Sequence, residues 1–479
     1  MADHTPHVVV AGGGIAGLAA AHRLVELTRA QQRPLRVTLL EAGQRLGGSI
    51  ATERTDGFVI EAGPDSFISE KPWALQLCER IGFTPRLVRT RDTDRRTFIV
   101  HHGALHPLPD GFLLLAPTQF RPLLTTRLFS WPGKLRMGMD LVLPRGPQCS
   151  DESLGSFVTR RLGREALERV AQPLVGGIYT ADPDDLSLAA TMPRFLEMER
   201  TSRSIIWAMW SQMRRAGSLG HATSGPRWSL FVSADTGMQS LVDALAQRLP
   251  EGVVRLGRAV TGLTASPAPK QEWTLTLADG SRLAADAVVL ATPAHQSVRF
   301  VAHLNARLAE ELGGIPYASS ATVSLGYRNE QLPRSLAGFG FVVPLVEGRS
   351  IVACTYSSMK YPGRAPDGHV LLRAFVGGAL QPQLFEQDDA TMAASVRREL
   401  SELLGITSAP LLTRIHRHAH AMPQYRVGHL DRVQRIDSAL AQHPGLAVAG
   451  NAYRGVGIPD CIHSGELAAE AVWRGLVAA

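Results

Sequence analysis

Three glycines close to the amino terminus have the spacing G-x-G-x-x-G, a pattern that binds the phosphates of a dinucleotide. Gly12 permits a tight turn, Gly14 lets the backbone approach a pyrophosphate, and Gly17 allows a helix to pack closely on a strand. The first N–H groups of a helix that begins here would donate to phosphate oxygens. We therefore predict a dinucleotide site along the whole run, whose other members are Gly13, Ile15 and Ala16.

The elements around this motif must hold it at the end of a sheet. An apolar run at 7–11 predicts a strand, a helical pattern covers 15–27, and a second strand at 36–40 ends at Glu41, an acid that can bind ribose hydroxyls. This order predicts a βαβ unit with parallel strands. A strand pattern at 446–450 and the helix after it look like parts of the same sheet. We expect a Rossmann-like nucleotide domain into which other domains are inserted.

The segments that follow resemble the amine-oxidase-like flavoprotein superfamily. The acid, arginine and paired glycines of 41–49, the loop at 60–66, the Ala-Thr-Pro at 291–293 and the run at 450–458 all match motifs of that superfamily. The resemblance implies that the dinucleotide is FAD, with Arg45 near the phosphates, Gly48 near the flavin and a helix N-terminus facing the flavin carbonyls. Beyond the glycine run, it implies a cofactor set of Glu41, Ala42, Arg45, Gly48, Ser49, Gly63, Pro64, Asp65, Ser66, Val260, Asn451, Val456, Gly457 and Ile458.

Further motifs at 63–67, 176–179, 338–344, 357–362, 375–378, 423–429 and 453–462 are similar to those of the protoporphyrinogen and coproporphyrinogen oxidase family. That resemblance implies a mixed α/β fold of three parts. A discontinuous FAD domain would comprise 1–90, 228–305 and 421–479, a mixed-sheet substrate domain 91–109, 191–227 and 306–420, and a helical membrane-associating domain 110–190.

The family implies a six-electron oxidation of a porphyrinogen by oxygen in haem synthesis, with hydride transfer to the flavin and release of hydrogen peroxide. We expect protoporphyrinogen IX as the substrate; the alternative is coproporphyrinogen III, which carries four carboxylate arms instead of two. A different flavin amine oxidase or desaturase, and a non-catalytic binding protein of the same fold, are the remaining alternatives. Because the flavin performs the chemistry, no catalytic side chain is predicted.

A tetrapyrrole needs apolar walls and cations for its carboxylates. By resemblance, Phe339, Val342 and Phe375 form walls and the Gly177 backbone approaches the ring, while Arg95 and Arg96 are candidates for a carboxylate arm. The chain departs from the family pattern at Thr97, where relatives have arginine, and at Pro459, where they have asparagine and where proline removes an N–H.

Composition limits the partners. The net charge is +7, and the stretch 111–149 alternates basic with apolar residues, which fits either an anionic membrane surface or a helical subdomain with a solvated basic face. The family resemblance favours peripheral attachment, and we expect a cytoplasmic protein on the inner face of the cell membrane, with a homodimer left open. No nucleic-acid motif, bilayer-spanning stretch or secretion signal is found, and Cys78, Cys149, Cys354 and Cys461 have no disulfide or metal spacing. His416, His418 and His420 alternate on one strand face, but no metal is expected there.

Overall fold

Five parallel strands build the nucleotide-binding end of the protein in a computed structural model that describes residues 5–92, 95–109, 112–113, 116–117, 120–146, 151–218, 230–266, 272–333 and 335–478. The strand order is β12-β2-β1-β16-β22. Its members are β1 (His7–Ala11), β2 (Arg36–Leu40), β12 (Val254–Arg255), β16 (Ala287–Leu290) and β22 (Leu446–Val448). All five residues of β1 are buried, as expected for a central parallel strand with both faces covered.

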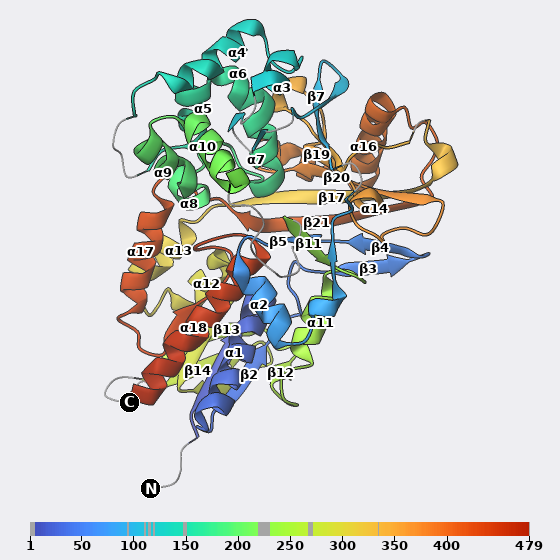
Figure 1. Ribbon diagram of the computed structural model, residues 1–479. Helices are drawn as coiled ribbons and strands as arrows, with labels where there is room; N and C mark the ends of the chain where they lie inside the picture. The colour runs from blue at the N-terminus through green and yellow to red at the C-terminus, as the bar shows by residue number, and fades with distance from the viewer. Residues whose placement is uncertain are drawn as a thin grey trace.

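Helix α1 (Ile15–Gln31) connects β1 to β2, so the predicted βαβ unit is confirmed. The C-terminal helix α18 (Ile458–Ala478) packs against α1 through a shared core that includes Leu24, Ala469 and Trp473. The beginning and the end of the chain therefore meet in one domain, at the bottom of Figure 1.

Smaller elements surround this sheet. They are strands β3 (Thr52–Thr55), β4 (Phe58–Glu61), β5 (Phe67–Ile68), β6 (Leu87–Arg89), β11 (Phe231–Ala234), β13 (Val260–Ala265), β14 (Trp273–Leu277) and β15 (Arg282–Ala285), with helices α2 (Pro72–Arg80), η1 (Thr84–Arg86), α11 (Gln239–Ala246), α12 (Ala294–Val301), α13 (Ala306–Gly313) and α17 (His429–Leu440).

A seven-stranded sheet crosses the middle of the molecule, in the order β21-β17-β20-β19-β18-β7-β8. All neighbours are antiparallel except β7 and β18, which are parallel. The strands are β7 (Thr97–His101), β8 (Ala104–Pro107), β17 (Tyr317–Arg328), β18 (Gly340–Val342), β19 (Ala353–Tyr356), β20 (His369–Gly377) and β21 (Leu412–Pro423). Helix α16 (Asp389–Leu404) covers one face, and α14 (Ser357–Lys360), α15 (Pro382–Phe385), η4 (Asn329–Gln331) and η5 (Leu345–Glu347) lie in the connections.

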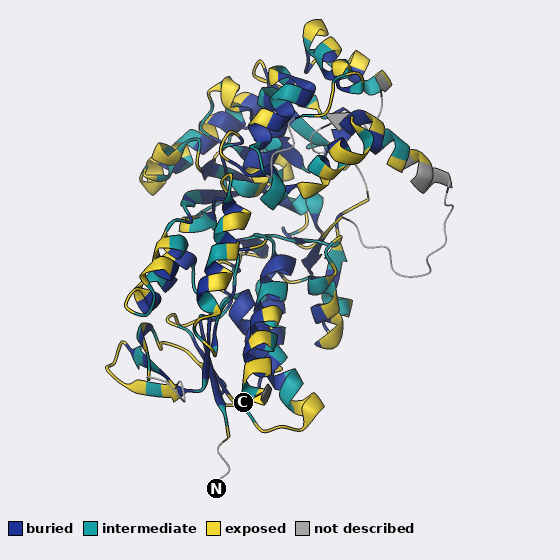
Figure 2. Cartoon of the chain, turned by 90° about the vertical axis from the view of Figure 1, so that its left-hand side faces the viewer, coloured by how far each residue is buried: buried dark blue, intermediate teal, exposed yellow. Residues whose placement is uncertain are grey.

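A helical unit covers the other face of this sheet at its far end, at the top of Figure 1. It contains β9 (Phe112–Leu113), β10 (Ala116–Pro117), α3 (Phe120–Thr125), α4 (Trp131–Gly138), η2 (Met139–Leu141), α5 (Leu154–Leu162), α6 (Arg164–Ala166), a π-helical turn η3 (Leu167–Ala171), α7 (Gln172–Tyr179), α8 (Leu188–Thr191), α9 (Pro193–Ser202) and α10 (Ile205–Ser218). Figure 2 shows exposed residues along its outer helices, whereas the parallel sheet is buried. No helix among the described residues has the length and apolar content needed to span a membrane.

The mixed α/β architecture agrees with the expectation, but the helical core extends past residue 190. Phe195, Ile206 and Met209 of α9 and α10 pack with Phe157 of α5. The buried Asp140 also accepts hydrogen bonds from the Ser204 hydroxyl and the Ile206 N–H, which ties the start of α10 to this core. We therefore group 193–218 with the helical unit rather than with the substrate domain.

Some expectations concern residues outside the described ranges. They include Cys149, and Gly111, Leu114 and Leu115 of the basic and apolar stretch. The described cysteines, Cys78, Cys354 and Cys461, are buried free thiols.

Candidate functional site

The glycine turn between β1 and α1 has the geometry that a bound pyrophosphate requires. Gly12 has φ of 112°, and a Cβ at Gly17 would lie 1.9 Å from the Gly12 carbonyl oxygen, so that packing requires glycine. A Cβ at Gly14 would meet no atom within 4 Å, so the backbone there borders open space. Gly14 caps α1 without a side-chain acceptor and the first turn of α1 holds no acid, which leaves the first N–H groups to an anion.

Glu41 lies directly beside this turn. Its Oε2 accepts a hydrogen bond from the Gly13 N–H and its Oε1 accepts one from the Gly43 N–H, both at 2.7 Å. Each carboxylate oxygen can accept a second bond, and the side chain is half-buried, so a ribose hydroxyl can approach it. Val260 is the first residue of β13. It lies near Glu41, since the N–H of Arg258, two residues earlier, donates to the Glu41 carbonyl at 2.8 Å.

Arg45 shapes the turn that carries the next predicted contacts. Its guanidinium donates to the carbonyls of Leu46 (3.1 Å), Gly48 (2.5 Å) and Ile50 (2.8 Å). The structure thus assigns Arg45 a role in holding the backbone at 46–50, and its contact with the phosphates stays a prediction. Ala42, Gly48 and Ser49 are all exposed.

The seven-stranded sheet holds the loop at Ala62–Ser66 in place. The Ala62 carbonyl accepts hydrogen bonds from the His418 Nε2 (2.8 Å) and the Thr322 hydroxyl (3.3 Å). Arg373 donates to the Gly63 carbonyl at 2.5 Å. These three donors come from three adjacent strands, so the sheet fixes the loop that the family resemblance places beside the flavin ring.

Asp65 concentrates charge at the end of this loop. Its Oδ2 lies 3.0 Å from the Lys360 Nζ, and its Oδ1 accepts from the Ser66 hydroxyl at 2.6 Å. Burial raises the pKa of Asp65, but the charges of Lys360 and Arg373 outweigh burial and hold that pKa well below its ordinary value. Asp65 is therefore a carboxylate at neutral pH and balances two cations below the cofactor site. Pro64 is half-buried between these contacts.

The C-terminal segment supplies the last predicted cofactor contacts, in the turn before α18. The Tyr425 hydroxyl donates to the Asn451 carbonyl (2.5 Å) and accepts from the Gly455 N–H (2.8 Å), which shapes the turn before α18. Val456 and Gly457 are half-buried, and Ile458 begins the helix.

Pro459 is the second residue of α18, and it departs from the family pattern. An N–H at this position has no acceptor within the helix, so proline removes no helical hydrogen bond there.

The expected substrate walls converge only in part. Val342 and Phe375 pack in the same apolar cluster as Val456, Leu174 and Tyr179. A Cβ at the neighbouring Gly177 would meet no atom within 4 Å, so α7 presents bare backbone to open space there. Phe339, the residue before β18, is half-buried and belongs to none of the apolar clusters found among the described residues.

The structure does not bring Arg95 and Arg96 to these walls. Arg96 lies over the ring of Phe98 (5.7 Å), which packs under α16 on the opposite face of the sheet from Phe375. Arg95 is exposed and pairs with Asp92. The cause is the alternation of β7, in which Ile99 faces the walls and positions 96 and 98 face away.

The three alternating histidines also separate. The His416 Nε2 lies 3.4 Å from the Glu53 carboxylate, and the His418 Nε2 bonds to the Ala62 carbonyl. The His420 backbone N–H donates to the Ser319 hydroxyl, and the His420 ring lies near that of His295. Burial lowers the pKa of His416 and of His418, so both rings are neutral at neutral pH.

Sequence reasoning missed Arg373, Lys360 and Thr322 as parts of the site. A signal for Arg373 was present, because it is the single charge between Val370 and Val376 in a strand that is otherwise apolar. Its partners could not be found in that way, since they lie on other strands and on a distant loop.

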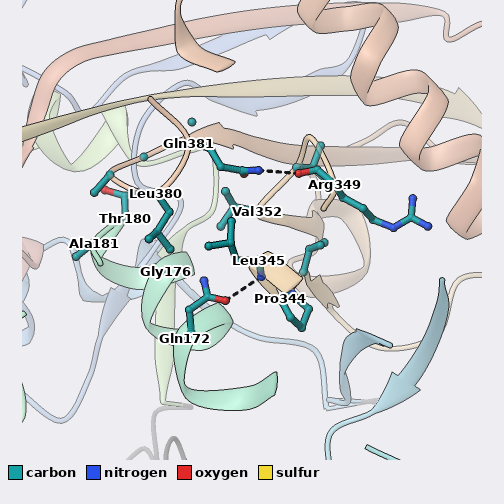
Figure 3. A pocket seen from close by; sticks show the side chains of 15 residues that line it. Gln172, Gly176, Thr180, Ala181, Pro344, Leu345, Arg349, Val352, Leu380 and Gln381 are labelled. Atoms are coloured by element: carbon teal, nitrogen blue, oxygen red, sulfur yellow. Dashed lines mark hydrogen bonds between the residues drawn. The ribbon is translucent and has the colours of Figure 1, made fainter. Parts of the chain in front are cut away.

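A pocket lies beside α7 (Figure 3). Gln172 and Gly176 of α7 face Leu345, Val352 and the turn after β20 across it. The Gln172 side chain accepts from the Leu345 N–H at 2.9 Å, which fastens η5 to α7.

The residues fit FAD: open backbone at Gly14, free N–H groups at a helix start, an acid at the ribose position and a fixed loop beyond them. Residues 15–473 match the family model of flavin-containing amine oxidoreductases. The chain is 37% identical over 469 residues to the coproporphyrinogen III oxidase of Bacillus subtilis, covering 98% of both chains. It is 30% identical to the chloroplastic protoporphyrinogen oxidase of Nicotiana tabacum, covering 96% of this chain and 84% of that one.

One solved structure is similar over the whole chain. It is a protein of Exiguobacterium sp. 255-15 with a provisional assignment as a protoporphyrinogen oxidase, which superposes with a TM-score of 0.85 at 34% identity over 99% of both chains. With the cofactor cradle and these matches together, the chain belongs to the flavin-containing amine oxidoreductase family, as an FAD-dependent oxidoreductase of its protoporphyrinogen and coproporphyrinogen III oxidase group.

Proposed function

We propose that this FAD-dependent oxidoreductase oxidises coproporphyrinogen III to coproporphyrin III with oxygen as the acceptor. The observation that carries the proposal is the identity of 37% to two coproporphyrinogen III oxidases, against 30% to the tobacco and 33% to the bovine protoporphyrinogen oxidase. The sequence-based preference for protoporphyrinogen rested on the basic and apolar stretch at 111–149. That stretch bears on membrane contact rather than on how many carboxylates the substrate carries.

Bound FAD would supply the two-electron acceptor for each oxidation step. The residues of the chain position the reactants. Val342 and Phe375 form an apolar wall beside Val456, and the open backbone of Gly177 leaves room for a flat ring. The bonds from Arg373 and His418 hold the loop at 62–65, which the family resemblance places beside the flavin ring.

Carboxylate arms require cations near the wall, and Arg194 on α9 is one. The Tyr179 hydroxyl donates to the Thr191 carbonyl at 3.4 Å, and Arg194 follows three residues later in α9, so it lies at the Tyr179 end of the wall. Arg194 is exposed and therefore accessible to a substrate carboxylate.

The test compares both porphyrinogens with tag-free, FAD-loaded protein in air, following porphyrin fluorescence. We expect a kcat/KM at least tenfold higher for coproporphyrinogen III, a difference of about 1.4 kcal/mol. Equal or faster turnover of protoporphyrinogen IX would overturn the substrate assignment, and protein that binds FAD but oxidises neither would overturn the activity.

The arginines provide a matched pair for the same assay. Arg194→Ala is expected to raise KM about tenfold, the cost of one charge-assisted contact. Arg96→Ala should leave KM within about twofold, because its guanidinium lies on the other face of the sheet. The reverse ranking would restore Arg96 as the carboxylate partner.

We also propose that the helical unit contacts an anionic membrane surface. Trp131, Leu135 and Val142 are 65%, 71% and 70% exposed, and the exposed Arg127 and Arg145 lie in the same segment. Apolar side chains among arginines fit the headgroup region of a bilayer. Sedimentation with phosphatidylglycerol vesicles should carry the wild type down and leave the Trp131→Ala/Leu135→Ala variant in solution. Wild-type protein that stays in solution contradicts this proposal.

A further inference from the structure

The β7–β8 hairpin carries an unusual turn at the edge of the seven-stranded sheet. Its two loop residues, His102 and Gly103, both have positive φ, at 50° and 71°. A two-residue turn of this kind favours asparagine followed by glycine, and a histidine in the first position is strained. In this turn the His102 ring lies beside that of His101, with 4.0 Å between ring centroids.

Glu347 of η5 completes a compact group of donors. The ligand atoms of His101, His102 and Glu347 all lie within 4.8 Å of one another, and the His101 Nδ1 is 3.7 Å from the Glu347 Oε1. His106 pairs with Ile99 across the hairpin, so it shares a sheet face with His101, and their ring centroids are 5.7 Å apart. Three imidazoles and one carboxylate therefore gather at one turn.

The carboxylate is fixed in place by that same turn. The Glu347 oxygens accept from the His102 N–H (2.9 Å) and the Gly103 N–H (3.1 Å). Metal ligands are commonly oriented by such outer hydrogen bonds.

Two arginines lie next to the group. Arg169 of η3 donates to the His101 Nε2 at 3.2 Å, and it also donates to the Leu128 carbonyl (2.6 Å) and pairs with Glu165 (2.9 Å). Arg349 lies close to Gly103 but is paired with Glu399 and Glu402.

We propose that His101, His102 and Glu347 bind a divalent cation of the zinc class as three protein ligands. Nitrogen and carboxylate donors in this number suit four-coordinate Zn²⁺. Binding through the His101 Nδ1 moves the ring proton to Nε2, so Arg169 must leave His101 for its other two acceptors. The cation and Arg169 therefore compete for one ring.

The position of the site gives binding a consequence. Glu347 lies in η5, whose Leu345 is fastened to Gln172 of α7, and Arg169 lies in the π-helical turn that leads directly into α7. Metal occupancy would thus act on both ends of the contact between the sheet edge and α7. None of the three proposed ligands is among the residues assigned to FAD or to the substrate wall.

The test uses tag-free protein at pH 7.5, with Co²⁺ as the spectroscopic probe and Zn²⁺ in competition. We expect one Co²⁺ per chain, visible bands typical of four-coordinate cobalt, and displacement by one equivalent of Zn²⁺. His102→Asn removes one ligand and suits the strained turn, so it should fold at least as well as the wild type and lose tenfold or more in Zn²⁺ affinity. Glu347→Gln should lose a similar factor.

Two further variants complete the design. His303→Ala, an exposed histidine outside the group, should bind like the wild type. Arg169→Ala should bind Zn²⁺ several times more tightly, because the competitor is gone. Unchanged affinity in both His102→Asn and Glu347→Gln would overturn the proposal, as would an absence of stoichiometric Co²⁺ binding by the wild type.

Discussion

The two faces of the seven-stranded sheet are built from the same strands but do different work. Under α16, Val323, Leu325 and Leu372 form an apolar core with Leu400. On the opposite face, the alternate positions carry Thr322, Ser324, Arg373 and His418, of which three bind the loop at Ala62 and Gly63. Neighbouring residues of one strand, such as Leu372 and Arg373, thus separate the stability of the domain from the placement of the cofactor loop.

The largest effect is expected on the apolar face. Leu372→Ala removes a fully buried side chain and should lower the free energy of unfolding by about 2–5 kcal/mol. Urea unfolding measures this loss, and the absorbance of bound flavin below the transition should stay that of the wild type. A changed flavin spectrum at unchanged stability would break the division between the faces.

The polar face should show the opposite pattern. Arg373→Met removes the bond to the Gly63 carbonyl and one of the two cations beside Asp65, while keeping much of the side-chain volume. We expect kcat/KM to fall about 10- to 100-fold, corresponding to about 1.4–2.7 kcal/mol, with a shifted flavin spectrum. If only the unfolding free energy changes, Arg373 is structural and does not position the loop.

A smaller effect is expected from pH. Burial lowers the folded-state pKa of His418 below the value of about 6.5 in the unfolded chain. The unfolded chain then binds the proton first as pH falls, so stability is present above pH 6.5 and is lost below it. Between pH 7.5 and 5.5 the unfolding free energy of wild type should decrease more steeply than that of His418→Gln. Parallel pH profiles would show that His418 titrates alike in both states.

The smallest effect is expected at Ser324. Its buried hydroxyl has no hydrogen-bond partner among the described residues, although it lies on the polar face. Ser324→Ala removes an unsatisfied group and should change the unfolding free energy by less than about 1 kcal/mol, in the stabilising direction. A clear loss of activity in this variant would mean that the hydroxyl has a partner in the working enzyme.

The same contrast explains what the sequence could predict. The glycine run, Glu41 and the strands around them are contiguous in the chain, so their spacing alone indicates the βαβ unit and its ligand. Arg96 and Arg373 depend instead on strand register and on which face each residue meets. Arg96 was expected at the substrate and lies on the α16 face, whereas Arg373, which holds the cofactor loop, had no neighbours in sequence that reveal its partner.

The interleaved order of the parallel sheet also bears on how the protein is made. Strand β1 is flanked by β2 and β16, and β16 in turn by β22, which is formed from residues 446–448. During synthesis, the glycine turn is the first part of the cradle to leave the ribosome, and the turn at 450–457 and helix α18 are the last. FAD therefore meets a finished site only after α18 has been made, and a chain that stops before it would lack both the cofactor and the helix that buries α1.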